Sequence, residues 1–149
     1  MNFEKIYVLD TNILLEDATN IFKLSDENKN LIILPETVLD EIDSKKSGFE
    51  EINFQAREFA RILENSSLLG TESFDDFKIV KLEVYDNFTT TINIISKIEY
   101  KSINSSTPHN IQNDRRILEV AKFVNDYYHN EVKFLSMDIM ARTRAISLD

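Results

Sequence analysis

The sequence contains no cysteine and no long apolar run. Without cysteine, a disulfide framework, a thiolate zinc site and a cysteine nucleophile are all excluded. The longest apolar run extends only from Leu31 to Pro35, far short of the ~20 residues that span a bilayer. The N-terminus, Met-Asn-Phe-Glu-Lys, lacks the basic and apolar regions of a signal peptide. We therefore expect a cytoplasmic protein without a membrane segment.

Positive charge is also scarce, because 17 Lys and Arg residues face 26 Asp and Glu residues, a net charge of −9 over 149 residues. This balance argues against tight electrostatic binding of nucleic acid by the protein alone. It remains compatible with an enzyme whose metal ions supply positive charge beside a phosphate. The length and a 42% hydrophobic content indicate one globular domain over residues 1–149.

Short strand-forming runs alternate with helical patterns along the chain. Buried strands are predicted at 6–9, 31–34 and 132–135, and a half-exposed strand at 78–84. Helices are predicted from Pro35, which should occupy the first helical position, from Ile52, after Asn113-Asp114 and after Asp138. The stretch from Tyr85 to Gln112 gives no clear pattern. This order predicts a three-layer α/β/α domain with a central, mainly parallel sheet, whose ligands bind beyond the carboxyl ends of its strands.

Acidic residues follow these predicted strands. Asp10 comes directly after the first strand, Asp138 lies just past the last, and Asp114 stands at the predicted start of the preceding helix. On the helix after the second strand, a rotation of 100° per residue directs Asp40 to solvent. Glu41 and Asp43 border the apolar stripe of that helix, and geometry alone does not choose between them.

Four carboxylates at one sheet edge would repel one another unless a cation lay between them. Oxygen ligands favour Mg²⁺ or Mn²⁺ over zinc, and such ions assist phosphodiester hydrolysis. Each acid also has an ordinary structural interpretation: Asp114 or Asp138 could cap a helix, and Glu41 could be a solvated helix residue.

Four segments in order resemble the acidic motifs of PIN-domain ribonucleases. They are Val8-Leu9-Asp10-Thr11-Asn12, Pro35 with Val38-Leu39-Asp40-Glu41-Ile42-Asp43, Asn113-Asp114-Arg115-Arg116-Ile117-Leu118, and Leu135-Ser136-Met137-Asp138. More narrowly, the chain is similar to the PIN domain at the N-terminus of PhoH-like ATPases. The features shared with that subgroup are Lys45-Lys46, Ala56-Arg57-Glu58 and Asp138-Ile139-Met140-Ala141-Arg142. One departure is Met137, where the subgroup usually has a lysine.

The resemblance implies that Asp10, Glu41, Asp114 and Asp138 bind Mg²⁺ or Mn²⁺, which selects Glu41 over Asp43. It further implies that the Asn12 side chain and the Thr11 hydroxyl hold the first acid and the attacking water. The implied reaction is hydrolysis of single-stranded RNA to 3′-hydroxyl and 5′-phosphate ends.

Basic residues near these motifs are candidates for contacts with the RNA backbone, although each could instead pair with surface acids. They are Lys45, Lys46, Arg57, Arg61, Arg115 and Arg142, with Arg116 and Arg144 as further candidates. The resemblance implies either a part of a longer protein with a PhoH-like ATPase domain or a free-standing relative, and it leaves a homo-oligomer open. Two alternative functions remain: the toxin ribonuclease of a toxin–antitoxin pair, and a catalytically weak module that binds RNA or protein.

Overall fold

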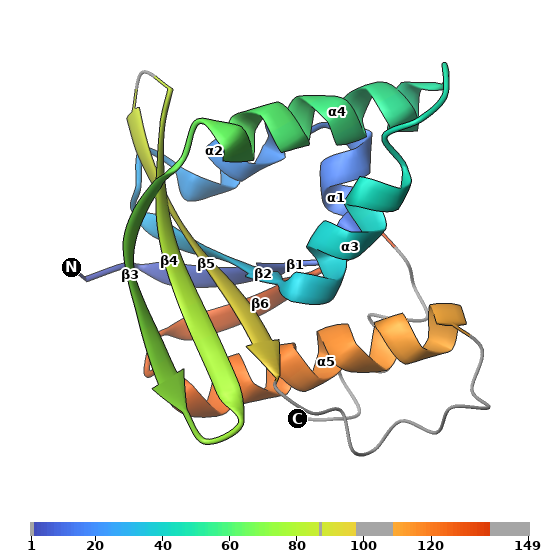
Figure 1. The fold of residues 1–149 in the computed structure, drawn as a ribbon. Helices are drawn as coiled ribbons and strands as arrows, with labels where there is room; N and C mark the ends of the chain where they lie inside the picture. Colours follow the sequence, from blue (N-terminus) through green and yellow to red (C-terminus); the bar gives the residue numbers. More distant parts are fainter. Residues whose placement is uncertain (1, 87, 98–108, 138–149) are drawn as a thin grey trace.

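A computed structural model describes residues 2–86, 88–97 and 109–137 of the chain (Figure 1). Its six strands are β1 Lys5–Leu9, β2 Asn30–Pro35, β3 Ser67–Phe74, β4 Phe77–Asp86, β5 Phe88–Lys97 and β6 Glu131–Leu135. Its five helices are α1 Thr11–Glu16, α2 Asn20–Ser25, α3 Glu36–Ser44, α4 Glu51–Glu64 and α5 His109–Tyr127. The predicted helix after Asp138 lies outside the described residues, as do residues 98–108 of the stretch that gave no clear pattern. No helix in these ranges is long and apolar enough to cross a bilayer.

The strands form one mixed sheet in the order β3-β4-β5-β2-β1-β6. Strands β5, β2, β1 and β6 are parallel, whereas β3, β4 and β5 are joined antiparallel. Helices α1 to α4 lie on one side of the sheet and α5 on the other (Figure 1). The predicted mainly parallel α/β fold, with helices on both faces, is thus confirmed.

Strands β1 and β2 form where continuous apolar runs predicted them, and each is slightly longer than expected. Every residue of β2 is buried, which suits a strand covered on both faces. The prediction that Pro35 opens the following helix was wrong. Pro35 still pairs with Ile95 in the sheet, has an extended ψ of 139°, and caps α3, which begins at Glu36. The fixed φ of proline suits this position at the strand end as well as a first helical turn.

The other four strands were predicted less well. Strand β4 is longer than the predicted 78–84, β5 lies in the stretch that gave no clear pattern, and β3 was not predicted at all. Strand β6 was expected to be buried, but it is an edge strand whose side chains are half-buried or exposed. Within the described sheet, β6 pairs with a single strand, β1.

Successive side chains of β1 and β2 point to opposite faces of the sheet, which divides the core into two clusters. Leu9, Ile32 and Leu34 point toward α1 to α4, while Val8 and Ile33 pack against α5. In α4 the buried stripe contains Asn53, Ala56 and Phe59, whereas Ile52, predicted to start it, is 38% exposed. In α5, Ile117 and Val124 are buried, and Tyr128 packs just beyond the helix end.

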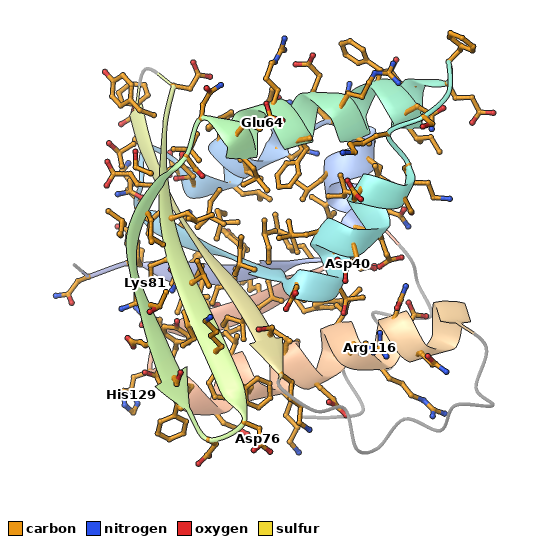
Figure 2. All side chains as sticks on the ribbon, in the orientation of Figure 1. Asp40, Glu64, Asp76, Lys81, Arg116 and His129 are labelled. Atoms are coloured by element: carbon orange, nitrogen blue, oxygen red, sulfur yellow. The ribbon has the colours of Figure 1, made fainter. Side chains whose placement is uncertain are left out.

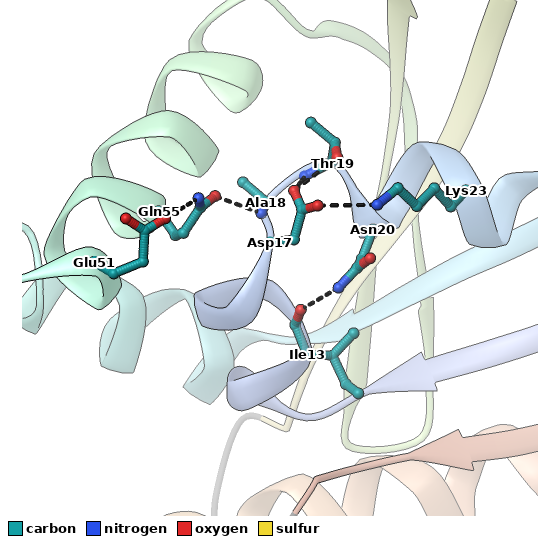
Figure 3. Close-up of polar contacts among 8 residues, drawn as sticks. All are labelled: Ile13, Asp17, Ala18, Thr19, Asn20, Lys23, Glu51 and Gln55. Carbon is teal, nitrogen blue, oxygen red and sulfur yellow. Dashed lines mark hydrogen bonds and ion pairs between the residues drawn. The ribbon is translucent and has the colours of Figure 1, made fainter.

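Helix α1 is held to its surroundings at its C-terminal end (Figure 3). Asp17 accepts hydrogen bonds from the Thr19 N–H, the Thr19 hydroxyl and the Lys23 ammonium at 2.7–2.9 Å. These donors lower the pKa of Asp17 to about 2. The Gln55 side chain of α4 accepts the N–H of Ala18 at 2.8 Å. The position of α1 is therefore fixed at the end remote from Asp10.

Candidate functional site

The carboxyl ends of β1 and β6 lie side by side. Leu9 pairs with Leu135, and the next N–H, that of Asp10, donates to the Leu135 carbonyl at 2.9 Å. From β1 the chain continues to β2 on one side, while β6 occupies the other side. Open α/β sheets bind ligands outside the carboxyl ends of their parallel strands, which is where Asp10 lies.

Asp10 is held rigidly at this edge. It is 6% exposed and caps α1, where its Oδ1 accepts the Thr11 N–H at 2.7 Å. Its Oδ2 accepts the Ser136 hydroxyl, also at 2.7 Å. Two donors from the ends of neighbouring strands therefore orient both oxygens of one buried carboxylate.

Ser136 was not predicted to be a site residue. It is the first residue after β6, just as Asp10 is the first after β1. The strand register that places them together cannot be derived from hydrophobic patterns, but the matching positions of the two polar residues are a usable signal.

Thr11 connects Asp10 to the second acidic motif. Its hydroxyl donates to Glu41 Oε1 at 2.8 Å, and Thr11 is itself 5% exposed. The resemblance implied that this hydroxyl would hold the first acid, but it is directed to the second, and the Thr11 backbone N–H binds Asp10 instead. Asn12 is exposed. One buried threonine thus links the carboxylates of Asp10 and Glu41.

Helix α3 presents its acids as the helical rotation predicted. Asp40 is exposed, Glu41 is half-buried against the Thr11 hydroxyl, and Asp43 is exposed and paired with Lys46 at 2.6 Å. Among the described residues, Glu41 rather than Asp43 is the acid brought to Asp10.

Helix α5 contacts α3 near this edge. Figure 2 shows Asp40 on α3 and Arg116 on α5. Partial burial and the neighbouring Glu36 carboxylate raise the pKa of Asp40, while the Arg116 charge opposes this rise. A positive side chain of α5 therefore acts electrostatically on the acidic surface of α3.

Of the third and fourth predicted acids, Asp114 and Asp138, the structure describes only Asp114. Asp114 is half-buried and lies inside α5, which begins at His109, so the interpretation of Asp114 as a helix cap was wrong. Asp138, two residues beyond Ser136, lies outside the described residues, as do Arg142 and Arg144. Whether all four acids meet therefore stays a prediction.

The donors at this edge fit a hard divalent cation. Within residues 2–86, 88–97 and 109–137, no group of three or more acidic or histidine side chains surrounds a common point. Asp10 and Glu41, linked through Thr11, nevertheless supply two carboxylates. Magnesium sites typically use one or two carboxylates and complete their coordination with water and substrate phosphate.

The loop between α3 and α4 is tied to α4. The Nη1 group of Arg57 donates hydrogen bonds to the backbone carbonyls of Lys46 and Gly48, at 2.7 and 3.0 Å. The Asn53 side chain donates to the Lys45 carbonyl at 2.8 Å and accepts the Glu50 N–H at 3.0 Å. Arg57, one of the candidates for RNA contact, therefore also shapes this loop.

Four other basic candidates lie on the surface. Arg61 forms an ion pair with Glu58, and Lys46 with Asp43. Lys45 and Arg115 are exposed. Their contact with RNA stays a prediction.

Comparison with known proteins agrees with this arrangement. The sequence model described as "PIN domain" matches residues 7–149. Protein PhoH2 of Bacillus subtilis (strain 168) is 30% identical over 150 residues, which cover 95% of this chain and 30% of PhoH2. The chain thus spans about a third of the length of this relative. On the family match over nearly its whole length, the chain belongs to the PIN domain family, whose members are generally metal-dependent nucleases.

Proposed function

We propose that residues 1–149 form a single nuclease domain, a cytoplasmic metal-dependent endoribonuclease. It hydrolyses phosphodiester bonds of single-stranded RNA and leaves 3′-hydroxyl and 5′-phosphate ends. The observation that carries the proposal is the linkage of Asp10 to Glu41 through Thr11 at the carboxyl edge of the parallel strands. The family match over residues 7–149 supports it.

Asp10, Glu41, Asp114 and Asp138 hold the cation, which is Mg²⁺ or Mn²⁺. When bound, such an ion supplies positive charge to the phosphate and makes hydroxide available near neutral pH. The Ser136 hydroxyl and the Thr11 N–H fix the Asp10 carboxylate, and the Thr11 hydroxyl fixes Glu41. Preorganised carboxylates need no rearrangement when the phosphate arrives, so they contribute to the rate.

The remaining residues of the first motif and the basic residues handle substrate. Asn12, exposed next to the buried Asp10 and Thr11, positions the attacking water. Basic side chains bind the phosphates that flank the cleaved bond, and because the chain is acidic overall, this contact must be local. These basic side chains are Lys45, Lys46, Arg57, Arg61, Arg115 and Arg142.

The similarity to PhoH2 leads us to propose that the domain works beside a PhoH-like ATPase domain. The aligned region covers 30% of PhoH2, which leaves most of that relative for other functions. An adjoining ATPase would feed or unwind RNA for the nuclease.

The test is cleavage of a 5′-labelled single-stranded RNA by wild type and by Asp10→Asn, each with Mn²⁺, with Mg²⁺ and with chelator. We expect cleavage by wild type with metal and none by the variant. Asp17→Asn is the matched control, because Asp17 lies at the other end of α1 and should leave cleavage intact. With a 3′-labelled substrate, digestion of the labelled 3′ fragment by a 5′-phosphate-dependent exonuclease would establish the 5′-phosphate end.

Melting curves give a second measurement. A cation that binds only the folded site raises the melting temperature, and Asp10→Asn should reduce this rise. An inert wild type, or a variant that cleaves equally well, would refute the nuclease proposal. RNA binding without cleavage would point to the binding module instead.

A second pair of variants tests which acid of α3, Glu41 or Asp43, binds the cation. Glu41→Gln should abolish metal-dependent cleavage, whereas Asp43→Asn should retain it, since Asp43 is exposed and paired with Lys46. The reverse outcome would show that Asp43 is the ligand.

A further inference from the structure

The two edge strands of the sheet differ in their protection against pairing with another chain. Strand β6 is five residues long and exposes Glu131 and Lys133. Strand β3 is eight residues long, mostly exposed, and contains no Lys, Arg or Pro. Edge strands present unpaired backbone groups, and charged residues or proline usually guard them. Of these guards, β3 carries only one charged residue, Glu72, besides a bulge between Leu68 and Gly70.

The single charge of β3 is already neutralised within its own chain. Glu72 accepts hydrogen bonds from Lys81 at 2.8 Å and from the Tyr127 hydroxyl at 3.1 Å. These partners lower the pKa of Glu72. A strand that approaches β3 therefore meets a carboxylate that is already paired. Although the chain has a net charge of −9, β3 itself carries no unpaired charge that would repel a second copy.

Both ends of β3 expose apolar side chains. Leu68 and Leu69 at one end are 65% and 53% exposed, and Phe74 at the other is 50% exposed. Leu69 lies on the α5 side of the sheet, where it lines a hollow together with Tyr127. Phe74 lies on the same side, with its ring centroid 5.1 Å from that of Tyr127.

An aromatic groove lies next to Phe74. It is a hollow of about 560 Å³ between the β3–β4 turn and α5. Phe74, Phe77, Phe123 and Tyr127 form its apolar wall, with the rings of Phe77 and Phe123 stacked at 4.0 Å. One end of β3 thus offers an aliphatic pair, and the other offers an aromatic groove on the face occupied by Leu69.

We propose that β3 pairs antiparallel with β3 of a second copy of this chain, across a two-fold axis at Thr71. A two-fold contact is self-complementary, so the aliphatic end of each strand meets the aromatic end of the other. Leu69 of each copy then packs against Phe74 and the aromatic groove of its partner. The two six-stranded sheets become one continuous sheet.

Two considerations favour this register of the two β3 strands: the charge of Glu72 and the side of the sheet to which each side chain points. With Thr71 opposite Thr71, each Glu72 opposes Gly70. A shift of two residues would place Glu72 opposite a second Glu72 in one direction, a repulsive pair, and opposite the apolar Leu68 in the other. A shift of one residue would set side chains of the α5 face against those of the other face. The axis at Thr71 avoids both conflicts.

The test is molar mass by light scattering and sedimentation for the 149-residue chain, at concentrations from micromolar to about a millimolar. Thr71→Lys and Thr71→Glu are the key variants, because Thr71 is exposed and both should fold. Each variant alone places like charges across the axis and should be monomeric. An equimolar mixture should recover the dimer, because Lys then faces Glu. Ser47→Lys, which adds the same charge in the exposed α3–α4 loop, is the control and should remain dimeric.

Leu69→Ser tests the groove contact and should weaken dimerisation by about tenfold or more, because it removes apolar area from the interface. A wild type that stays monomeric at every concentration overturns the proposal and leaves β3 to a different partner. A dimer that persists in Thr71→Lys, or a mixture that stays monomeric, overturns the pairing at Thr71. RNA cleavage by Thr71→Lys should equal that of wild type, which keeps this result separate from the proposed nuclease function.

Discussion

The bond from Thr11 to Glu41 permits a sharp test of the proposed site. Thr11→Val replaces the hydroxyl with a methyl group of similar shape and leaves the backbone N–H that binds Asp10 unchanged. A hydrogen bond to a charged acceptor contributes about 1.5–3 kcal/mol. If that energy holds Glu41 in its working position, the cleavage rate at saturating metal should fall about 10-fold to 100-fold. Global stability should fall by only about 1 kcal/mol, because the half-buried Glu41 can turn to water.

Thr11→Ser is the matched control. It keeps the hydroxyl and loses a methyl group, so cleavage should stay near the wild-type rate. The assay is the initial cleavage rate as a function of Mn²⁺ concentration, together with urea denaturation of each variant. Combining Thr11→Val with Glu41→Gln completes a double-mutant cycle in urea denaturation, in which the two losses of stability should be far from additive. Equal rates for Thr11→Val and Thr11→Ser, or fully additive losses, would refute the role assigned to this bond.

Three further outcomes follow from contacts elsewhere. Ser136→Ala removes a buried donor to Asp10, so the free energy of unfolding should drop by about 1–2 kcal/mol in urea denaturation; no drop would refute the contact. Asp17 has a folded pKa of about 2 against an ordinary value of 3.8, so its stabilisation is present above pH 3.8 and is lost as the pH falls through about 2. Because its side chain is 37% exposed, Asp17→Asn should cost only about 1 kcal/mol at pH 7, and the difference should shrink toward zero in melts near pH 2. Phe59→Ala, at a side chain 1% exposed, should cost about 3–5 kcal/mol, and a loss below 1 kcal/mol would contradict the packing of α4.

Strands β1 and β2 could be predicted because their burial on both faces requires continuous apolar runs. The runs 6–9 and 31–34 show this directly. Strand β3 could not, because an exposed edge strand places few demands on its side chains, and Ser67 to Phe74 has no consistent alternation. Strand β5 was missed for a different reason. Thr91 and Asn93 are polar yet buried, which breaks the pattern that identifies a covered strand.

The site was predictable in its residue types and less so in its contacts. Asp10 followed from its place after a strand, and Glu41 from the family resemblance. The partner of the Thr11 hydroxyl and the contact of Ser136 with Asp10 depend on strand register and helix rotation, which composition does not determine. The start of α5 at His109 was missed because Asn113 and Asp114 look like capping residues, although Asn113 is buried inside the helix.

The pairing of β1 with β6 has a consequence for the timing of folding. Asp10 and Ser136 are separated by 126 positions in the sequence, so their contact carries a large loop-closure cost, whereas the hairpins of β3, β4 and β5 join near neighbours. During synthesis, β6 leaves the ribosome long after β1 to β5. A nascent chain can therefore fold its hairpins while the acidic edge is still incomplete, and it would acquire nuclease activity only once β6 has been added. On the proposed function, the ribosome-bound chain would in this way remain inactive toward the messenger RNA that encodes it.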